Sequence, residues 1–82
     1  RAMQLAAQAV ALDPRSVPAA LAESYARQAR FDLTGALAAV RRGSDAEPDN
    51  GLILARLAEL LLASGDLDGA VAAAQAAVAI RA

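Results

Sequence analysis

The side chains that could carry out chemistry are few, and the most reactive types are absent. The chain of 82 residues has no His and no Cys, which removes imidazole acid–base catalysis, thiolate nucleophiles and the usual zinc ligands. Tyr25 has no base near it in the sequence, so we expect it to pack rather than to catalyse. Asp66 and Asp68 resemble part of a calcium loop, but the further acidic ligands of such a loop are missing. The sequence therefore predicts no enzyme activity, no metal site and no cofactor.

Charge and hydropathy exclude two classes of partner. The net charge is -1 and neither sign forms a long run, so the basic surface that follows a phosphate backbone is absent. Polar residues interrupt every apolar stretch before it reaches the roughly 18 residues of a membrane span. We expect neither nucleic acid nor membrane as a partner. Arginine supplies every basic side chain, which together with 25 alanines fits a GC-rich bacterial genome. Any targeting segment would lie outside these residues, so bacterial cytoplasm and periplasm both stay open.

A 34-residue period runs through the chain and determines how the elements are arranged. Small residues and helix breakers recur at this spacing: Ala2, Ala36 and Ala70; Ala9, Gly43 and Ala77; Asp13-Pro14 and Glu47-Pro48. A unit of this length cannot bury its own apolar face, so successive units stack into an array. A generic alanine-rich bundle is the alternative, but a bundle does not require breakers to recur one period apart. The sequence thus favours a repeat array.

Apolar spacing and helix caps predict five helices and no strands. Their expected extents are 2–12, 16–30, 33 to about 44, 50–64 and 67–80, with caps at Ser16, at Asp49 or Asn50, and at Asp66. We expect Gly65 to end the fourth helix in the left-handed conformation. The apolar stripe of the third helix fades at Gly43, which predicts a weak last turn. Links of two to five residues make neighbouring helices antiparallel.

The repeated unit resembles the tetratricopeptide repeat, a helix-turn-helix of 34 residues. The best copy contains Leu57-Ala58, Leu61, Gly65-Asp66, Ala70 and Ala77 at the places of the family motif. The preceding copy is similar but displaced, because Leu21-Ala22-Glu23 matches Leu57-Ala58-Glu59 at 36 residues, which predicts a first helix slipped by two positions. The resemblance covers 1–82 as one array: 1–14 as the second helix of a partial repeat, 16–48 as the slipped repeat and 49–82 as a full one. It implies an all-α fold of antiparallel hairpins stacked as a right-handed α-solenoid of five helices.

The resemblance also implies a concave groove, lined by the first helix of each hairpin, that binds a peptide or helix of a partner protein. The principal groove residues expected here are Ala19, Glu23, Arg27, Leu52, Ala55, Arg56, Glu59 and Leu62, with Ala20, Ala26 and Ala63 beside them. Some family members hold a partner's terminal carboxylate with Lys and Asn, and neither type occurs in this set. Arg27 and Arg56 could bind an acidic group, or could pair with Glu23 and Glu59 on their own helices.

Two functions of different classes follow from this sequence. The first is a protein–protein interaction module that acts as a scaffold through its groove. The second is a structural spacer or a self-assembly segment of a longer repeat protein, in which exposed terminal helices pack on further repeats or on another copy. Leu52 and Leu62 serve either function, because they could anchor a partner or meet a neighbouring repeat.

Overall fold

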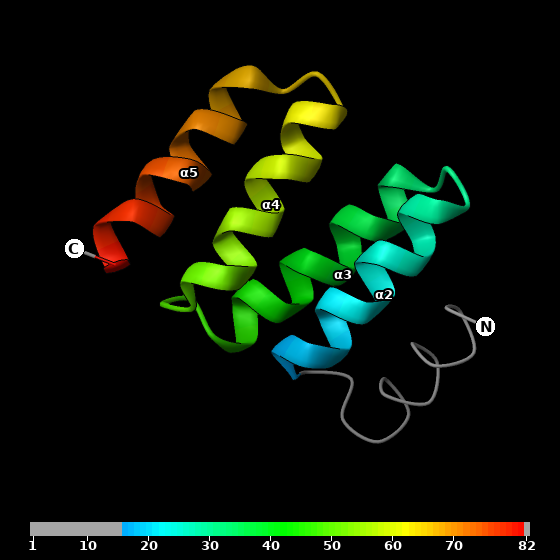
Figure 1. The fold of residues 1–82 in the computed structure, drawn as a ribbon, viewed down its shortest axis with the longest axis horizontal. Coiled ribbons are helices and arrows are strands. Elements are labelled where there is room, and N and C mark those ends of the chain that lie inside the picture. The colour runs from blue at the N-terminus through cyan, green and yellow to red at the C-terminus, as the bar shows by residue number, and fades with distance from the viewer. Residues whose placement is uncertain (1–15, 82) are drawn as a thin grey trace.

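The computed structural model describes residues 16–81, the last of them by its backbone alone, and within this range the chain is entirely helical (Figure 1). The four helices are α2 (Val17–Ala29), α3 (Leu33–Ala46), α4 (Gly51–Ala63) and α5 (Leu67–Arg81). They form two antiparallel hairpins, α2 with α3 and α4 with α5, which confirms the all-α expectation. Four helices are found where five were expected, and the helix expected over 2–12 lies outside the described residues.

The turns inside the two hairpins are built alike. Each contains a residue with positive φ, Phe31 at 62° and Gly65 at 90°, whose N–H donates to the carbonyl three residues back. The aspartate that follows, Asp32 or Asp66, donates its N–H to the carbonyl five residues back, which completes a Schellman motif. The carboxylate of the same aspartate caps the next helix by accepting an N–H, from Gly35 at 2.8 Å and from Gly69 at 2.9 Å. One residue type thus ends one helix and starts the next.

The helix boundaries recur every 34 residues, so the expected two-residue slip is wrong. Asn50 follows Ser16 by 34 positions, and both cap the first helix of a hairpin: Ser16 Oγ accepts the N–H of Ala19 at 3.2 Å, and Asn50 Oδ1 accepts that of Ile53 at 3.3 Å. Asp66 follows Asp32 by the same interval. The matching tripeptides that begin at Leu21 and Leu57 therefore occupy different places in their hairpins, and the structural counterpart of Leu57 is Glu23.

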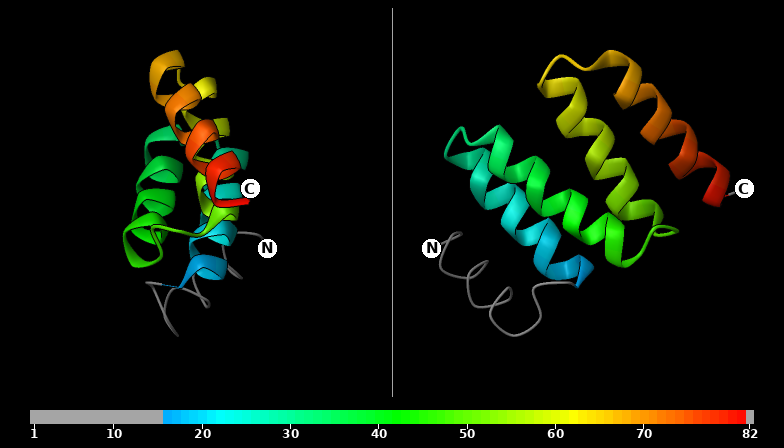
Figure 2. Two further views of the ribbon diagram at one scale, coloured as in Figure 1. Left: turned by 90° about the vertical axis from the view of Figure 1, so that its left-hand side faces the viewer. Right: turned by 180° about the vertical axis from the view of Figure 1, so that it is seen from behind.

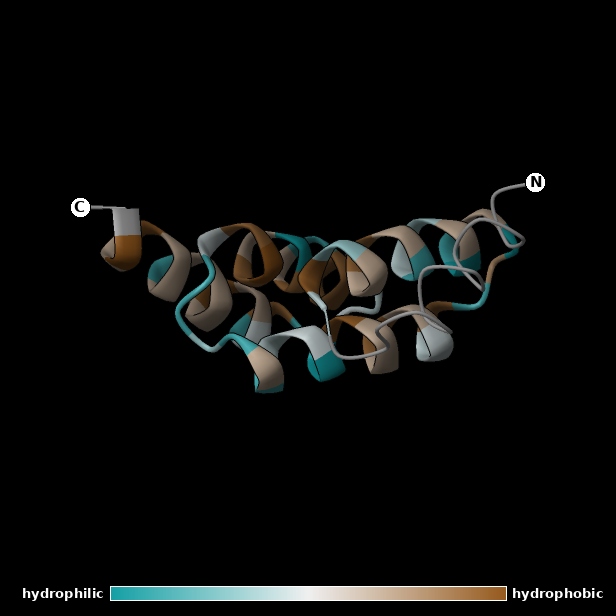
Figure 3. Cartoon of the chain, turned by 90° about the horizontal axis from the view of Figure 1, so that it is seen from below, coloured by the Kyte–Doolittle hydropathy of each residue, from teal (hydrophilic) through white to brown (hydrophobic). Residues whose placement is uncertain are grey.

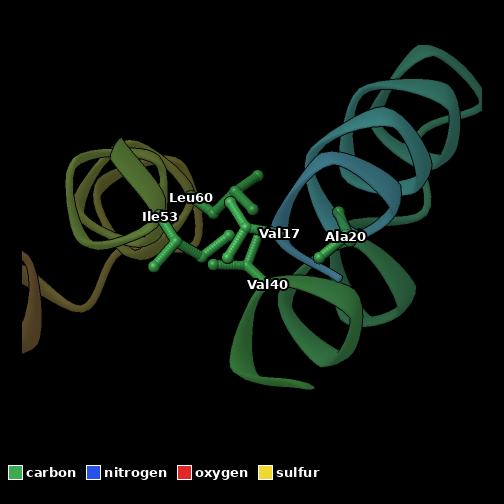
Figure 4. Packing of buried hydrophobic residues seen from close by; sticks show 6 residues of the cluster. Val17, Ala20, Val40, Ile53 and Leu60 are labelled. Carbon is green, nitrogen blue, oxygen red and sulfur yellow. The ribbon is translucent and has the colours of Figure 1, made fainter. Parts of the chain in front are cut away.

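Helix α4 joins the hairpins by packing its buried face against α2 and α3. Figure 4 shows Ile53 and Leu60 pointing from α4 toward Val17 and Val40, and all four side chains are buried. The contact is close at Gly43, where a Cβ would lie 2.7 Å from Cβ of Ala20 and 3.0 Å from Cδ1 of Ile53. Gly43 is thus a packing position and not the start of a fading helix, which explains why α3 continues to Ala46.

Helix α5 lies at the open edge of the molecule. Its backbone approaches α4 alone among the described helices, and Ala70 and Ala73 pack with Leu61 in a second, smaller core. The two hairpins lie side by side with α5 at one margin (Figure 2). In Figure 3 the chain stays mainly brown, the apolar end of the scale, up to the terminus marked C. None of the four described helices has the length and hydropathy to cross a membrane.

Phe31 offers a test of this account of the turns. Phe31 occupies the place of Gly65, and its side chain is 95% exposed. A bulky residue in the left-handed region costs about 1–2 kcal/mol, part of which is offset by the greater freedom of glycine in the unfolded chain. We expect Phe31→Gly to raise the free energy of unfolding by about 0.5–1 kcal/mol in a urea titration. A variant less stable than the wild type would show that Phe31 makes a stabilising contact.

Candidate functional site

Arg56 connects the first helices of the two hairpins. It lies three residues after Ile53 and four before Leu60, so the helical period places it on the buried face of α4. Its side chain is only 5% exposed and reaches α2, where Nε donates to Ser24 Oγ at 3.0 Å and Nη2 donates to Gln28 Oε1 at 2.7 Å. The arginine therefore holds α2 and α4 together through hydrogen bonds to neutral acceptors.

The same guanidinium fixes an aromatic ring at the surface. Its central carbon lies 3.8 Å from the centroid of the Tyr25 ring, which is the geometry of a cation–π contact. Nη1 of Arg56 is 3.5 Å from Oε1 of Glu59, so the pairing alternative for this arginine is present. Tyr25 was expected to pack in the core, but it is 56% exposed and presents the other part of its ring to solvent.

Glu23 and Arg27 belong to an ion-pair cluster that stabilises the first hairpin. Arg27 Nε lies 2.9 Å from Glu23 Oε2 and its Nη1 lies 3.1 Å from Asp32 Oδ2, while Arg42 Nη2 of α3 lies 2.7 Å from Glu23 Oε1. Burial alone would raise the pKa of Glu23, but hydrogen bonds from Arg27 and Arg42 outweigh it and lower that pKa. The N–H of Gly35 and then Arg27 lower the pKa of Asp32. The carboxylate of Glu23 is committed to this cluster.

The expected groove residues divide into two groups. Leu52, Ala55, Glu59 and Leu62 are exposed and Arg27 is half-buried, whereas Ala19, Glu23 and Arg56 are buried; among the flanking residues Ala63 is exposed and Ala20 and Ala26 are buried. The choice on α4 thus finds surface, apart from Arg56. The choice on α2 finds mainly interior, because it was transferred with the slipped alignment.

The 34-residue register identifies the residues of α2 that the sequence reasoning missed. The counterparts of Ala55, Glu59 and Leu62 are Leu21, Tyr25 and Gln28, none of which is buried. Tyr25 and Gln28 meet Arg56 directly, so they lie beside the α4 residues. The interval between Ser16 and Asn50 carried this signal in the sequence, since both are N-cap residues.

We name the resulting surface the α2/α4 face, and define it as Tyr25, Gln28, Leu52, Ala55, Glu59 and Leu62. The α4 members are three or four residues apart, so they form one stripe on the helix. The face combines exposed aliphatic groups, a stacked phenol and one carboxylate, a composition suited to binding rather than to bond breaking. Residues 16–80 contain no cluster of three His, Cys, Asp or Glu side chains arranged to hold a metal ion.

Replacing Arg56 tests whether it holds the two helices together. We expect Arg56→Met, which retains the aliphatic stem, to lower the free energy of unfolding by about 1–2 kcal/mol, because the hydrogen bonds to Ser24 and Gln28 and the contact with Tyr25 are lost. The matched control is Arg41→Met at an exposed position of α3, with an expected change within about 0.5 kcal/mol. Equal stability of the two variants in urea would contradict the proposed role of Arg56.

The ion-pair cluster makes stability depend on pH. Because the pKa of Glu23 is lower in the folded chain than its ordinary value near 4.3, its stabilisation is present above that value and is lost as pH falls through the folded pKa. We expect Glu23→Gln to cost about 1 kcal/mol at pH 7 and clearly less at pH 3. Urea titrations of both proteins at the two pH values provide the measurement. A cost that does not change with pH would refute a contribution from the charge of Glu23.

Comparison with known proteins adds the family to this geometry. Searches of curated proteins and of solved structures returned no match to the chain. A sequence model of the family described as tetratricopeptide repeat matches residues 29–82, which is more than half of the chain. The matched range includes α3, α4 and α5, together with the Schellman turn, the aspartate cap and the small residues described above. The chain therefore belongs to the tetratricopeptide repeat family.

Proposed function

We propose that this chain is a protein–protein interaction module whose α2/α4 face binds a peptide or a helix of a partner protein. One observation carries the proposal: Leu52 and Leu62 are 63% and 59% exposed on a helix whose opposite face buries Ile53 and Leu60 completely. The fold does not need these leucines for its own core, and exposed apolar groups gathered on one face are typical of docking surfaces. Membership of the tetratricopeptide repeat family supports the same function.

The proposal includes the wider architecture expected from the sequence. Residues 16–48 and 49–82 form two repeats, and residues 1–14 form the second helix of a partial one. Their hairpins stack as a right-handed α-solenoid, so that the first helices of successive hairpins share one side. The contact of α2 with α4 through Arg56 supports this arrangement, since it places Tyr25 and the exposed stripe of α4 on a common surface.

The chemistry of the α2/α4 face limits what it binds. Its aliphatic members and the ring of Tyr25 favour apolar side chains, and the exposed carboxylate of Glu59 favours a basic group over an acidic one. Arg56 and Arg27 already have protein acceptors. We therefore propose a partner segment with apolar anchors flanked by basic residues, and not a terminal carboxylate held by arginine.

Self-assembly is the second candidate function, and the surface of α5 favours it. Val71, Val78 and Ile80 are between 42% and 65% exposed, and such residues could pack against another copy of the chain. The isolated protein would then form dimers or larger species. A self-sufficient binding module would instead remain monomeric.

A double variant of the α2/α4 face separates the two functions. Affinity capture from a bacterial lysate with the full chain, followed by mass spectrometry, is compared with capture by Tyr25→Ala/Leu52→Glu. We expect the variant to lose the captured partners, because a charge replaces an apolar anchor and the aromatic contact is removed. Ala38→Glu, at an exposed position of α3, is the matched control and should retain them.

The outcome that would contradict the binding proposal is capture that survives in the double variant. Light scattering supplies the second measurement, since binding through the α2/α4 face predicts a monomeric wild type. A wild-type dimer combined with unchanged capture would favour self-assembly.

A further inference from the structure

The second hairpin carries an apolar groove that is separate in its chemistry from the α2/α4 face. We call it the end groove. It consists of two adjoining hollows between α4 and α5, with volumes of about 220 and 310 Å³, that share Ala58 and Ala74. Leu62, Leu67 and Val71 line the larger hollow, and each of these side chains is more than half exposed.

The first hairpin shows what covers this surface when it is occupied. Moving back 34 residues along the chain turns Ala74, Ala77 and Ala58 of the end groove into Val40, Gly43 and Ser24. These three contact α4: Val40 and Gly43 pack against Ile53, and Ser24 accepts a hydrogen bond from Arg56. The corresponding surface of the first hairpin is thus filled by an amphipathic helix.

The end groove needs larger side chains than α4 provides. Val17 and Val40, which meet Ile53 and Leu60 in the first hairpin (Figure 4), are replaced by Gly51 and Ala74. Both replacements remove aliphatic volume, and both residues line the smaller hollow. A ring or a long aliphatic side chain at the place of Ile53 would fill this space, since packed interfaces tolerate few voids.

The polar requirement of the occupant also changes. In the first hairpin Arg56 meets Ser24, Gln28 and the ring of Tyr25. The counterparts in the second hairpin are Ala58, Leu62 and Glu59, so both neutral acceptors are lost and one exposed carboxylate is gained. A basic residue of an occupying helix would therefore find a single partner, Glu59.

We propose that the end groove binds an amphipathic helix of a partner protein, oriented on α4 and α5 as α4 is on α2 and α3. The helix presents two bulky apolar residues seven positions apart and a basic residue three positions after the first. Within residues 16–80 only Ile53, Arg56 and Leu60 have this spacing, and all three are already buried. A described helix of a second copy therefore does not provide the occupant.

The test measures binding of a designed peptide to the full chain by fluorescence anisotropy. The labelled peptide has the sequence of residues 49–65 with Ile53→Phe, and with glutamine at the leucines that would not face the groove: Leu52, Leu54, Leu57, Leu61 and Leu62. We expect saturable binding that Ala74→Glu, inside the groove, weakens at least about tenfold. Ala72→Glu, exposed on the same helix and outside the groove, is the matched control and should bind as the wild type does.

A charge exchange tests the orientation of the helix. Glu59→Lys should weaken the peptide several-fold, and a peptide with Arg56→Glu should regain affinity for that variant. Leu52→Glu should leave peptide binding unchanged, so the result stands apart from the fate of the α2/α4 face. Absence of saturable binding, equal loss in Ala74→Glu and Ala72→Glu, or no rescue by the exchanged charges would overturn the proposal. A wild-type dimer that Ala74→Glu converts to a monomer would also overturn it, because a second copy would then be the occupant.

Discussion

The packing of α4 against α2 and α3 at Gly43 is the contact on which the rest of the structure depends. There the Cα of Gly43 faces Ala20 and Ile53 with no room for a further carbon atom. Ile53 and Leu60 are fully buried as a result, and burial of each side chain contributes about 1.5–3 kcal/mol to stability. Without this contact the two hairpins would have no common core, because α5 approaches α4 alone among the described helices. The close approach therefore makes one domain out of two hairpins.

The same contact determines which surfaces remain for partners. One side of α4 is buried against the first hairpin and another against α5, so its remaining stripe, from Leu52 to Leu62, faces solvent. Arg56 at the edge of the buried side links α4 to α2 and supports the ring of Tyr25 beside that stripe. On the second hairpin the surface that corresponds to the α4 docking site is uncovered and hollow. Binding capacity thus arises because each hairpin offers a surface of the kind that α4 covers on the first.

Much of the fold could be predicted from the sequence, because local chemistry determines it. Ser16, Asn50 and Asp66 cap helices as their side chains predict, and Gly65 adopts positive φ. The site was harder, because a tripeptide match at 36 residues outweighed the caps at 34 and moved the groove residues of α2 into the interior. The role of Arg56 was not readable either, since its partners Ser24 and Gln28 are 32 and 28 residues away in sequence. Contacts between hairpins depend on tertiary packing, which the local pattern does not specify.

The most direct test of this account is the free energy of unfolding of Gly43→Leu beside that of Ala38→Leu. Both substitutions introduce the same side chain into α3, at a buried and at an exposed position. The account predicts a loss of at least about 2 kcal/mol for Gly43→Leu, because overpacking displaces Ile53 and Ala20, and a change within about 0.5 kcal/mol for Ala38→Leu. Equal stability of the two variants would contradict it, because α4 would then not depend on close approach at Gly43.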